Sequence, residues 1–504
     1  MNYELLIQEA DRVYQVAQRT PLQKASKLSE YHKQSIWFKR EDLQSVFSFK
    51  LRGAFNKMAS LTLEQRARGV ITASAGNHAQ GVALSGRQMG IPVLIVMPVT
   101  TPQIKIAAVQ ALGGQVILQG VSYSEAQEYA LQRAHAESLC FIPPFDDPLV
   151  IAGQGTVGRE ILEQHPEPIT AIFVPVGGGG LISGVAVYVK QHRPDIQIIG
   201  VQPKDSCAMK QSLQMGERVN LPQVGLFADG VAVRQVGVET FRLCQDWVDD
   251  IITVDTDELC AAMKDFYDET RVVLEPAGAL SLAGVVQWIE SGHATPHALI
   301  AISSGANCNF DRLRFVAERA QLGEHREVMF AATIPEHLGS FRAFCQLLGD
   351  RSVTEFNYRY SDPKQAHVFV GVSIQSADEA AVLFDDLRRA EINVLDLRQN
   401  ELAKLHLRHL VGGHAPDIQH EWLYRFEFPE RPGALMTFLN QLGQDWNITL
   451  FHYRNHGSDS GRVLVGLQVP PRDKPAFMTF LQKLGYPWVD ETNNPARGLF
   501  LGNT

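Results

Sequence analysis

One lysine of this chain lies between two apolar residues, in a segment that could hold its amine in a poorly hydrated position. Residues 48–53 read Ser-Phe-Lys-Leu-Arg-Gly, so Lys50 follows Phe49 and precedes Leu51. Partial burial lowers the pKa of a lysine and makes the neutral amine a nucleophile that can condense with an aldehyde. A single lysine on a helix is more often a solvated surface charge, so other segments must decide.

A run of small residues, Thr-Ala-Ser-Ala-Gly-Asn-His at 72–78, follows a predicted strand at 69–74 and opens a predicted helix. Small residues at a helix N-terminus expose backbone N–H groups, which favours an anion such as a substrate carboxylate. An ordinary N-cap would also explain the pattern, and Asn77 alone does not decide between the two. The candidate substrate-binding residues are Ser74, Ala75, Gly76, Asn77 and His78.

Four consecutive glycines, Gly177–Gly180, lie between a predicted strand at 171–176 and a predicted helix that begins at Leu181. Such a backbone can wrap an anion, and the helix dipole adds to the attraction, so this turn is a candidate phosphate cup. The dinucleotide fingerprint GxGxxG does not fit here, and the next predicted strand ends in Gln202 instead of an acid for a ribose. A P-loop is excluded because no Gly-Lys-Ser/Thr follows.

A fourth small-residue turn, Ser303–Asn307, follows a predicted strand at 298–302. By itself it indicates nothing more than a turn. Together, the four segments offer a lysine, a carboxylate-binding loop, a phosphate cup and a hydroxyl at the ends of strands. That set suits a cofactor with one phosphate and one aldehyde.

The elements that must position these groups alternate along residues 36–305. Apolar runs of strand length alternate with amphipathic stretches of helical length, which predicts parallel sheets covered on both faces. Ligands of such α/β folds bind outside the C-terminal ends of the strands. The predicted strands are 69–74, 91–98, 115–120, 139–144, 171–176, 196–202 and 298–302, and the main predicted helices are 77–90, 101–114, 122–138 and the segment from 181.

After Asn307 the chain becomes more charged and then repeats itself at a spacing close to 95 residues. Each copy has the order of a βαββαβ ferredoxin-like module. The matching pairs are 334–341 with 428–435, 354–359 with 449–454, and 368–372 with 463–467. We therefore predict one large domain at 1–321 and two modules at 322–416 and 417–504, with the Gly339 and Gly433 turns each opening a helix whose exposed N–H groups could receive an anion.

Composition excludes several classes of protein. The formal net charge is 46 − 55 = −9, which argues against a broad nucleic-acid-binding face. No apolar run approaches the length of a membrane span. The six cysteines are scattered without a CxxC pair, which indicates reduced thiols in a cytoplasmic protein and no zinc site. His452 and His456 are more typical of a hairpin surface than of a metal site, and we predict no metal.

The motifs SFKLRGA, TASAGNHAQG, VPVGGGGL, VLEPAGA and SGANCNFDRL resemble those of the fold-type II pyridoxal-phosphate family. Over essentially the whole chain the resemblance is to biosynthetic threonine dehydratases, which carry paired ACT-like regulatory modules. It implies an α/β fold with a fold-type II catalytic domain that binds pyridoxal 5′-phosphate, followed by two α+β modules.

The resemblance also implies roles for individual residues. Lys50 would hold the cofactor aldehyde and then act as the base for the α-proton, and Ser304 would meet the pyridine nitrogen. A neutral serine there leaves the ring a weaker electron sink, which favours prompt loss of the β-hydroxyl, with the cofactor phosphate as the acid for its departure. The remaining implied cofactor contacts are Phe49 beside the ring, Asn77 at the ring 3-oxygen, and Gly177, Gly178, Gly179, Gly180 and Leu181 at the phosphate.

Two positions depart from the racemases of this fold. Those enzymes carry a serine directly before the Gly-Asn of the second loop, whereas this chain has Ala75. A site with a single base should eliminate water and not racemise. Gln202 stands where racemases and some relatives have a glutamate near a cation site.

The activity that the resemblance implies is dehydration and deamination of L-threonine to 2-oxobutanoate and ammonia, the first step of isoleucine biosynthesis. Isoleucine would inhibit the enzyme and valine would relieve the inhibition, in a cytoplasmic homotetramer. Another β-eliminating or β-replacing enzyme of the class, such as a serine dehydratase or threonine synthase, is an alternative. An amino-acid sensor with an inactive catalytic half is an alternative from another class, and the intact Lys50 argues against it. A nicotinamide oxidoreductase is a further alternative, and the failed dinucleotide fingerprint argues against it.

Overall fold

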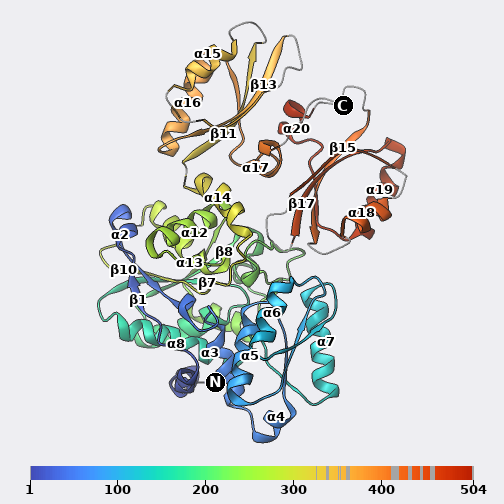
Figure 1. Ribbon diagram of the computed structural model, residues 1–504. Coiled ribbons are helices and arrows are strands. Elements are labelled where there is room, and N and C mark those ends of the chain that lie inside the picture. Colours follow the sequence, from blue (N-terminus) through green and yellow to red (C-terminus); the bar gives the residue numbers. More distant parts are fainter. Residues whose placement is uncertain are drawn as a thin grey trace. The chain divides into compact units, whose positions relative to one another are not determined.

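The computed structural model of the protein consists of two compact units, Met1–Phe310 and Asp311–Thr504 (Figure 1). Helix α14 (Arg312–Gly323) therefore belongs to the second unit, whereas the change in sequence pattern predicted a boundary near Leu322. No helix among the described residues is long and apolar enough to span a membrane. The structure describes residues 2–293, 295–324, 326–335, 340–349, 351, 353–358, 364–409, 419–429, 434–442, 446–454 and 460–501.

The first unit contains a six-stranded sheet in the order β1-β2-β10-β7-β8-β9. All neighbouring strands are parallel except β1, which pairs antiparallel with β2. Buried strands with helices against both faces are what the alternating pattern predicted, and the predicted strands that fall in this sheet are confirmed. The strands are β1 (Leu22–Lys24), β2 (Ser35–Lys39), β7 (Ile169–Pro175), β8 (Gln197–Pro203), β9 (Asp250–Val254) and β10 (Ala298–Ile302).

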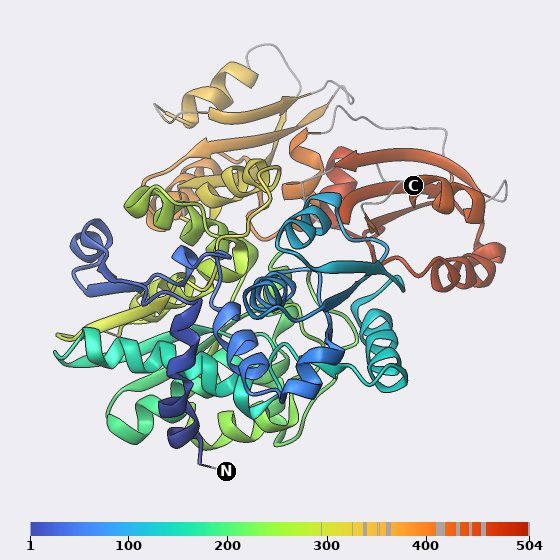
Figure 2. The same ribbon diagram turned by 60° about the horizontal axis from the view of Figure 1, so that its bottom comes forward.

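A second, four-stranded parallel sheet with the order β5-β4-β3-β6 forms the other part of this unit (Figures 1 and 2). Its strands are β3 (Val70–Ala73), β4 (Val93–Met97), β5 (Gln115–Leu118) and β6 (Cys140–Phe141). β3 leads into the predicted loop Ser74–His78. β6 leads into the segment that contains Pro144, whose backbone oxygen contacts Lys50. The four predicted strands of this region are thus confirmed, with β6 shorter than predicted.

Helices of the first unit cover both sheets. The N-terminal segment forms α1 and then a 3₁₀ helix. The α-helices are α1 (Tyr3–Gln8), α2 (Ser26–His32), α3 (Lys50–Ala59), α4 (Leu63–Arg68), α5 (Asn77–Met89), α6 (Gln103–Ala111), α7 (Tyr123–Ala136), α8 (Pro148–Gln164), α9 (Gly180–His192), α10 (Ala208–Met215), α11 (Val238–Trp247), α12 (Thr256–Thr270) and α13 (Pro276–Glu290). The 3₁₀ helices are η1 (Glu9–Gln15), η2 (Glu41–Leu43), η3 (Lys204–Ser206) and η4 (Asp229–Val231).

The second unit contains two antiparallel sheets with the same topology, which confirms the predicted repeat of βαββαβ modules. Their strand orders are β12-β13-β11-β14 and β16-β17-β15-β18. The first module comprises β11 (Glu327–Pro335), α15 (Ser340–Leu347), β12 (Val353–Tyr358), β13 (Gln365–Ser373), α16 (Ala377–Arg389) and β14 (Asn393–Asp396). The second comprises β15 (Glu421–Pro429), α18 (Ala434–Leu442), β16 (Asn447–Arg454), β17 (Ser460–Gln468), α19 (Lys474–Leu484) and β18 (Trp488–Asp490).

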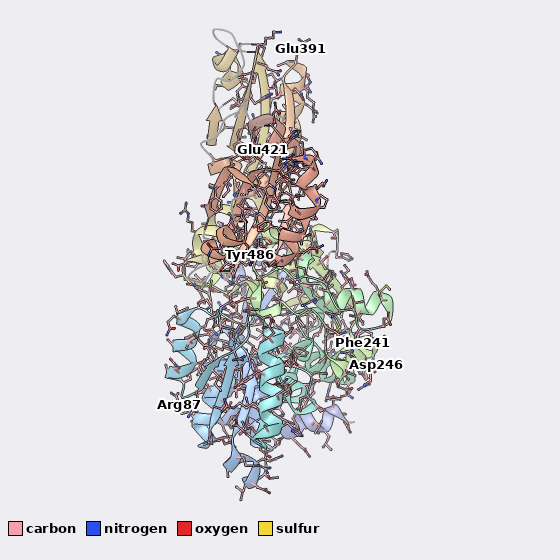
Figure 3. All side chains as sticks on the ribbon, turned by 90° about the vertical axis from the view of Figure 1, so that its right-hand side faces the viewer. Arg87, Phe241, Asp246, Glu391, Glu421 and Tyr486 are labelled. Carbon is pink, nitrogen blue, oxygen red and sulfur yellow. The ribbon has the colours of Figure 1, made fainter. Side chains whose placement is uncertain are left out.

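Each module has its own core, and a third cluster joins the two. Met329 and Phe369 of the first sheet share this cluster with Leu423 and Leu464 of the second. Figure 3 marks Glu391 in the first module and Glu421 and Tyr486 in the second. The remaining elements of this unit are α17 (Glu401–Leu405), η5 (Leu407–His409), η6 (Pro471–Asp473) and α20 (Pro495–Phe500). Gly339, Gly433 and His456 lie outside the described residues.

Candidate active site

Lys50 is the first residue of α3, and its amine is partly buried. Nζ donates a hydrogen bond to the backbone oxygen of Pro144 at 2.9 Å and lies 5.4 Å from the centroid of the Phe49 ring. Burial lowers the pKa of the Lys50 amine to about 8, and the carboxylate of Glu275 opposes this shift. A substantial fraction of the amine is therefore neutral and nucleophilic near neutral pH.

The helix that begins at Lys50 is held in place by a buried group of charged residues. Arg52, which has no exposed side-chain surface, contacts Glu41 Oε1 at 2.8 Å and Glu160 Oε1 at 2.6 Å. The ammonium of Lys39 contacts the other oxygen of Glu160 at 2.5 Å. Two cations and two carboxylates balance one another, which a buried ionic group requires. The network therefore determines the position of the first turn of α3.

Asn77 begins α5, directly after the small-residue loop, and both ends of its amide are engaged. Its Nδ2 donates to Glu275 Oε1 at 2.6 Å, and its Oδ1 accepts from Asn307 Nδ2 at 2.7 Å. Glu275 immediately precedes α13, yet its side chain does not cap that helix. The structure thus joins the 72–78 loop, the VLEPAGA motif and the 303–307 turn through one amide.

His78 is buried, with 3% of its surface exposed. Its Nε2 lies 2.9 Å from the backbone oxygen of Ile142, so the proton of the neutral ring must reside on Nε2. Among the described residues Nδ1 has no hydrogen-bond partner. Burial and the positive charge of Lys50 lower the pKa of His78 to about 3, so the ring stays neutral.

The glycine run forms the turn between β7 and α9, as predicted. Gly179 has φ +100°, a conformation that side chains other than glycine rarely adopt. A Cβ added at Gly178 would lie 2.3 Å from the ring of Phe145, so this position has no room for a side chain. Gly180 opens α9, and Leu181 is buried behind it. An anion placed at this turn would meet free N–H groups and the positive end of the helix dipole.

The Ser303–Asn307 turn lies beside the segment that carries Lys50. Ser304 is 3% exposed, and its backbone oxygen accepts from Phe49 N at 3.3 Å. Ser48 and Gly305 form an isolated antiparallel bridge. The Ser304 hydroxyl donates a long, 3.4 Å hydrogen bond to the Ala277 oxygen, so little holds it against reorientation toward a ligand.

The structure therefore brings Lys50, Asn77 and Ser304 together, and the glycine turn adjoins them through Phe145, the neighbour of Pro144. Ser74 and Ala75 lie in the same loop as Asn77, where Ser74 Oγ accepts from Gly76 N at 3.2 Å.

Sequence reasoning assigned no role to Glu275, Asn307 or Pro144. Glu275 lay within the motif VLEPAGA, but a residue before a proline at the start of a helix indicates only where the helix begins. Pro144 contributes only a backbone oxygen, which leaves no signal in residue type.

Gln202 is a structural residue at the end of β8. It is fully buried, donates to the oxygens of Val176 and Ser206, and accepts from Lys210 N at 2.9 Å. Its amide is therefore occupied within the fold. Among the residues that the structure describes, no three His, Cys, Asp or Glu side chains are grouped to hold a metal ion. His452 instead lies against His406, with 2.7 Å between their Nδ1 atoms.

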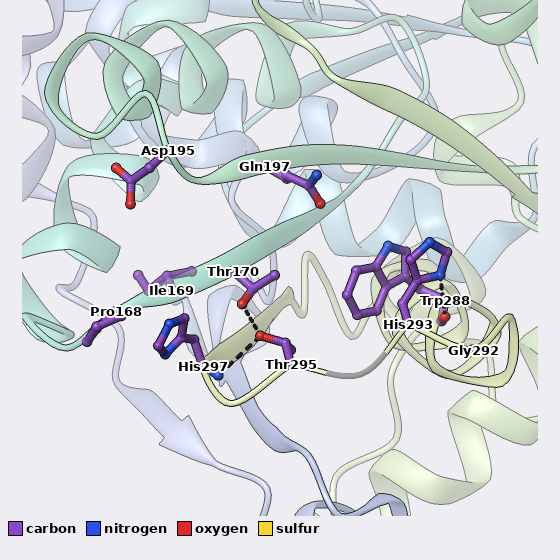
Figure 4. A pocket seen from close by; sticks show the side chains of 10 residues that line it. All are labelled: Pro168, Ile169, Thr170, Asp195, Gln197, Trp288, Gly292, His293, Thr295 and His297. Atoms are coloured by element: carbon purple, nitrogen blue, oxygen red, sulfur yellow. Dashed lines mark hydrogen bonds between the residues drawn. The ribbon is translucent and has the colours of Figure 1, made fainter.

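A polar cavity of about 680 Å³ lies at the opposite edge of the large sheet (Figure 4). Its lining includes Ile169 and Gln197, which begin β7 and β8, and His297, which precedes β10. Its lining includes none of the candidate active-site residues. The candidate site instead lies at the carboxyl ends of the strands, where parallel sheets bind ligands.

Comparison with known proteins gives consistent matches. Residues 13–305 match the family described as pyridoxal-phosphate dependent enzyme, and residues 318–407 and 412–501 each match the C-terminal regulatory domain of threonine dehydratase. The biosynthetic L-threonine dehydratase of Burkholderia multivorans is 58% identical over 493 residues, 97% of either chain. That of Escherichia coli is 54% identical and covers 97% of this chain and 95% of its own.

Solved structures match about two thirds of the chain. The processed form of threonine deaminase isoform 2 from Solanum lycopersicum is 51% identical with a TM-score of 0.62, and the match covers 64% of this chain and 88% of that one. Maize serine racemase is 34% identical with a TM-score of 0.59, covering 64% of this chain and 98% of its own.

Proposed function

Since the chain belongs to the family of pyridoxal-phosphate-dependent enzymes, we propose that it uses this cofactor to convert L-threonine into 2-oxobutanoate and ammonia. The observation that carries the proposal is the identity of 58% over 97% of the chain with a biosynthetic L-threonine dehydratase. The product is the carbon skeleton from which isoleucine biosynthesis begins. The first unit supplies the chemistry and the paired modules regulate it, with catalytic residues within 1–321 and modules at 322–416 and 417–504.

The residues present fit pyridoxal phosphate. The turn at Gly177–Gly180 suits a phosphate, because no side chain covers its backbone N–H groups. Phe145 fills the space that a side chain at Gly178 would need. Lys50 suits the aldehyde, because its amine has a pKa of about 8. Asn77 suits the ring 3-oxygen, since an amide nitrogen carries two hydrogens and Glu275 accepts only one. Phe49 and Ser304 complete the set beside the ring and at its nitrogen.

When bound, the cofactor stabilises negative charge at the substrate Cα. Lys50 first holds the cofactor and then, as a free amine, takes the proton from Cα. The N–H groups of residues 74–78 bind the substrate carboxylate at the start of α5. His78 adds no positive charge to this loop, because its pKa of about 3 keeps the ring neutral. Ala75 offers no proton carrier on the face opposite Lys50, so elimination of the β-hydroxyl is favoured over racemisation.

The two modules of the second unit bind isoleucine and valine, with isoleucine favouring a state of low activity and valine opposing it. The match of both modules to the regulatory domain of threonine dehydratase supports this assignment. The active form is a homotetramer in the cytoplasm.

Release of 2-oxobutanoate by the purified full-length protein with pyridoxal phosphate tests the proposal. We expect turnover of threonine, inhibition by isoleucine, and relief of that inhibition by valine. Lys50→Ala should remove turnover and leave a folded protein that binds the cofactor weakly. Faster turnover of serine than of threonine, or near-normal activity of Lys50→Ala, would contradict the assignment. A full-length enzyme indifferent to isoleucine would contradict the regulatory part alone.

A further inference from the structure

The segment Ile142–Asp147, which connects β6 to α8, contacts Lys50, the 72–78 region and the glycine turn. The oxygen of Ile142 accepts from Thr72 and faces His78, the oxygen of Pro144 accepts from Lys50, and Phe145 packs against Gly178 and Gly180. The segment ends in two adjacent aspartates, Asp146 and Asp147. Asp146 caps a helix that is distant in the chain, whereas Asp147 caps the helix that follows it and pairs with Lys57 of α3 at 2.7 Å. The two can therefore be compared as a distant cap and a local one.

Asp147 caps the helix that follows it. Its Oδ1 accepts from Leu149 N at 2.9 Å and Val150 N at 3.2 Å, at the start of α8. This is an ordinary N-cap, in which an aspartate satisfies the first free N–H groups of its own helix.

Asp146 instead caps α11, which begins 92 residues later in the chain. Its carboxylate accepts from the first three N–H groups of that helix: Val238 at 2.8 Å, Glu239 at 3.0 Å and Thr240 at 3.2 Å. The N-cap residue of α11 is Gly237, which has no side chain to do this, and a Cβ there would lie 2.3 Å from Asp146 Oδ1. The helix therefore depends on a distant residue for its cap. Figure 3 marks two further residues of α11, Phe241 and Asp246.

The capped end of α11 holds the glycine turn. Thr240, which is fully buried, donates its hydroxyl to the oxygen of Gly178 at 2.6 Å. A trans peptide unit is planar, so fixing the Gly178 oxygen on one side directs the N–H of Gly179 to the other. An oriented Gly179 N–H is what a phosphate at this turn requires.

We infer that Asp146, acting through Thr240, is a positioning residue for the cofactor phosphate: the cap fixes α11, and α11 fixes the Gly178–Gly179 peptide. The inference rests on the proposed use of pyridoxal phosphate. The negative charge of Asp146 by itself opposes a phosphate nearby, so its benefit to the site comes from the hydrogen bonds. An asparagine, which also caps helices well, should therefore replace it, whereas an alanine should not.

The test compares dissociation constants of the cofactor-depleted full-length protein for pyridoxal phosphate and for pyridoxal, which lacks the phosphate. Asp146→Ala should weaken binding of pyridoxal phosphate about three- to tenfold, the factor that corresponds to the usual stability cost of a lost cap when that cost is carried over to cofactor binding. It should change binding of pyridoxal by less than about twofold. Asp147→Ala is the matched control: it should lower the Tm but leave the affinity for pyridoxal phosphate within about twofold. Asp146→Asn should bind pyridoxal phosphate with the affinity of the wild-type protein.

Equal effects of Asp146→Ala and Asp147→Ala on cofactor affinity would overturn the inference. So would an equal loss for pyridoxal and pyridoxal phosphate. If Asp146→Ala does not fold, Thr240→Val removes the hydroxyl with little change of shape, and unchanged affinity in that variant overturns the inference as well. A wild-type protein that binds no pyridoxal phosphate would instead refute the proposed function.

Discussion

The amine of Lys50 should titrate near pH 8 in the cofactor-depleted protein, because burial lowers its pKa from 10.5 to about 8. At pH 7.5 a pKa of 8 leaves about a quarter of the amine neutral, whereas an ordinary lysine is neutral in only about a thousandth of molecules. The site thus gains about 200-fold in neutral amine. This gain is the physical basis for assigning the aldehyde to Lys50.

The informative perturbation is Glu275→Gln. The carboxylate of Glu275 raises the pKa of Lys50 against the larger effect of burial, so removing its charge should move the titration of Lys50 to lower pH. Glutamine keeps an oxygen that can accept from Asn77 Nδ2, which preserves the local hydrogen bond. The matched control is Glu163→Gln, which neutralises a partly exposed carboxylate of α8 that pairs with Arg19.

Competitive acylation with trace acetic anhydride between about pH 6 and 11, followed by peptide mass spectrometry, measures this titration without any cofactor. Wild type and Glu163→Gln should share a midpoint near pH 8, and Glu275→Gln should have a lower one. A wild-type midpoint near that of an ordinary lysine would refute the burial argument. An upward shift in Glu275→Gln would refute the role assigned to the carboxylate.

Three further predictions concern the surroundings of Lys50. Arg52→Met leaves two buried carboxylates with one cation, so it should lower the free energy of unfolding by about 3–5 kcal/mol in urea denaturation. The control Arg19→Met removes an exposed ion pair and should lower it by less than about 1 kcal/mol. Folding lowers the pKa of His78 from 6.5 to about 3, so between these pH values the unfolded chain binds a proton that the folded chain does not. The free energy of unfolding should therefore fall as the pH drops from 6.5 toward 3, and His78→Gln should make this pH dependence shallower. Ala75→Ser should introduce detectable racemisation of serine by supplying a second proton carrier, and chiral chromatography that finds no D-serine above wild type would contradict the one-base argument.

Local patterns were sufficient to predict seven strands of the first unit, the repeated modules and the loops at the sheet ends, whereas β1, β2 and β9 were not predicted. The glycine turn was predictable because a run of four glycines between a strand and a helix has few structural explanations. The small-residue loop before Asn77 was predictable because it follows a strand, so chain direction places it at the carboxyl end of β3.

Contacts between distant residues were not predictable in this way. Asn77 and Glu275 are 198 residues apart, and nothing in either segment indicates that they pair. Asp146 and Asp147 are the same residue type in adjacent positions, and only the fold shows that one caps its own helix and the other caps α11. Pro144 acts through its backbone oxygen, which every residue possesses. Residue type and spacing therefore predicted the candidate reacting groups, whereas the contacts that orient them required the structure.

The opposing effects on Lys50 explain why a buried carboxylate stands so close to a nucleophilic amine. Burial alone would lower the pKa further and give an amine that is neutral but a weak base. The proposed reaction needs both properties, because Lys50 must bind an aldehyde as a neutral amine and later remove a proton from Cα. A general base works best when its pKa lies near the working pH. By raising the pKa back to about 8 and holding Asn77 at the same time, Glu275 adjusts the amine for both proposed steps and links it to the loop that we propose binds the substrate.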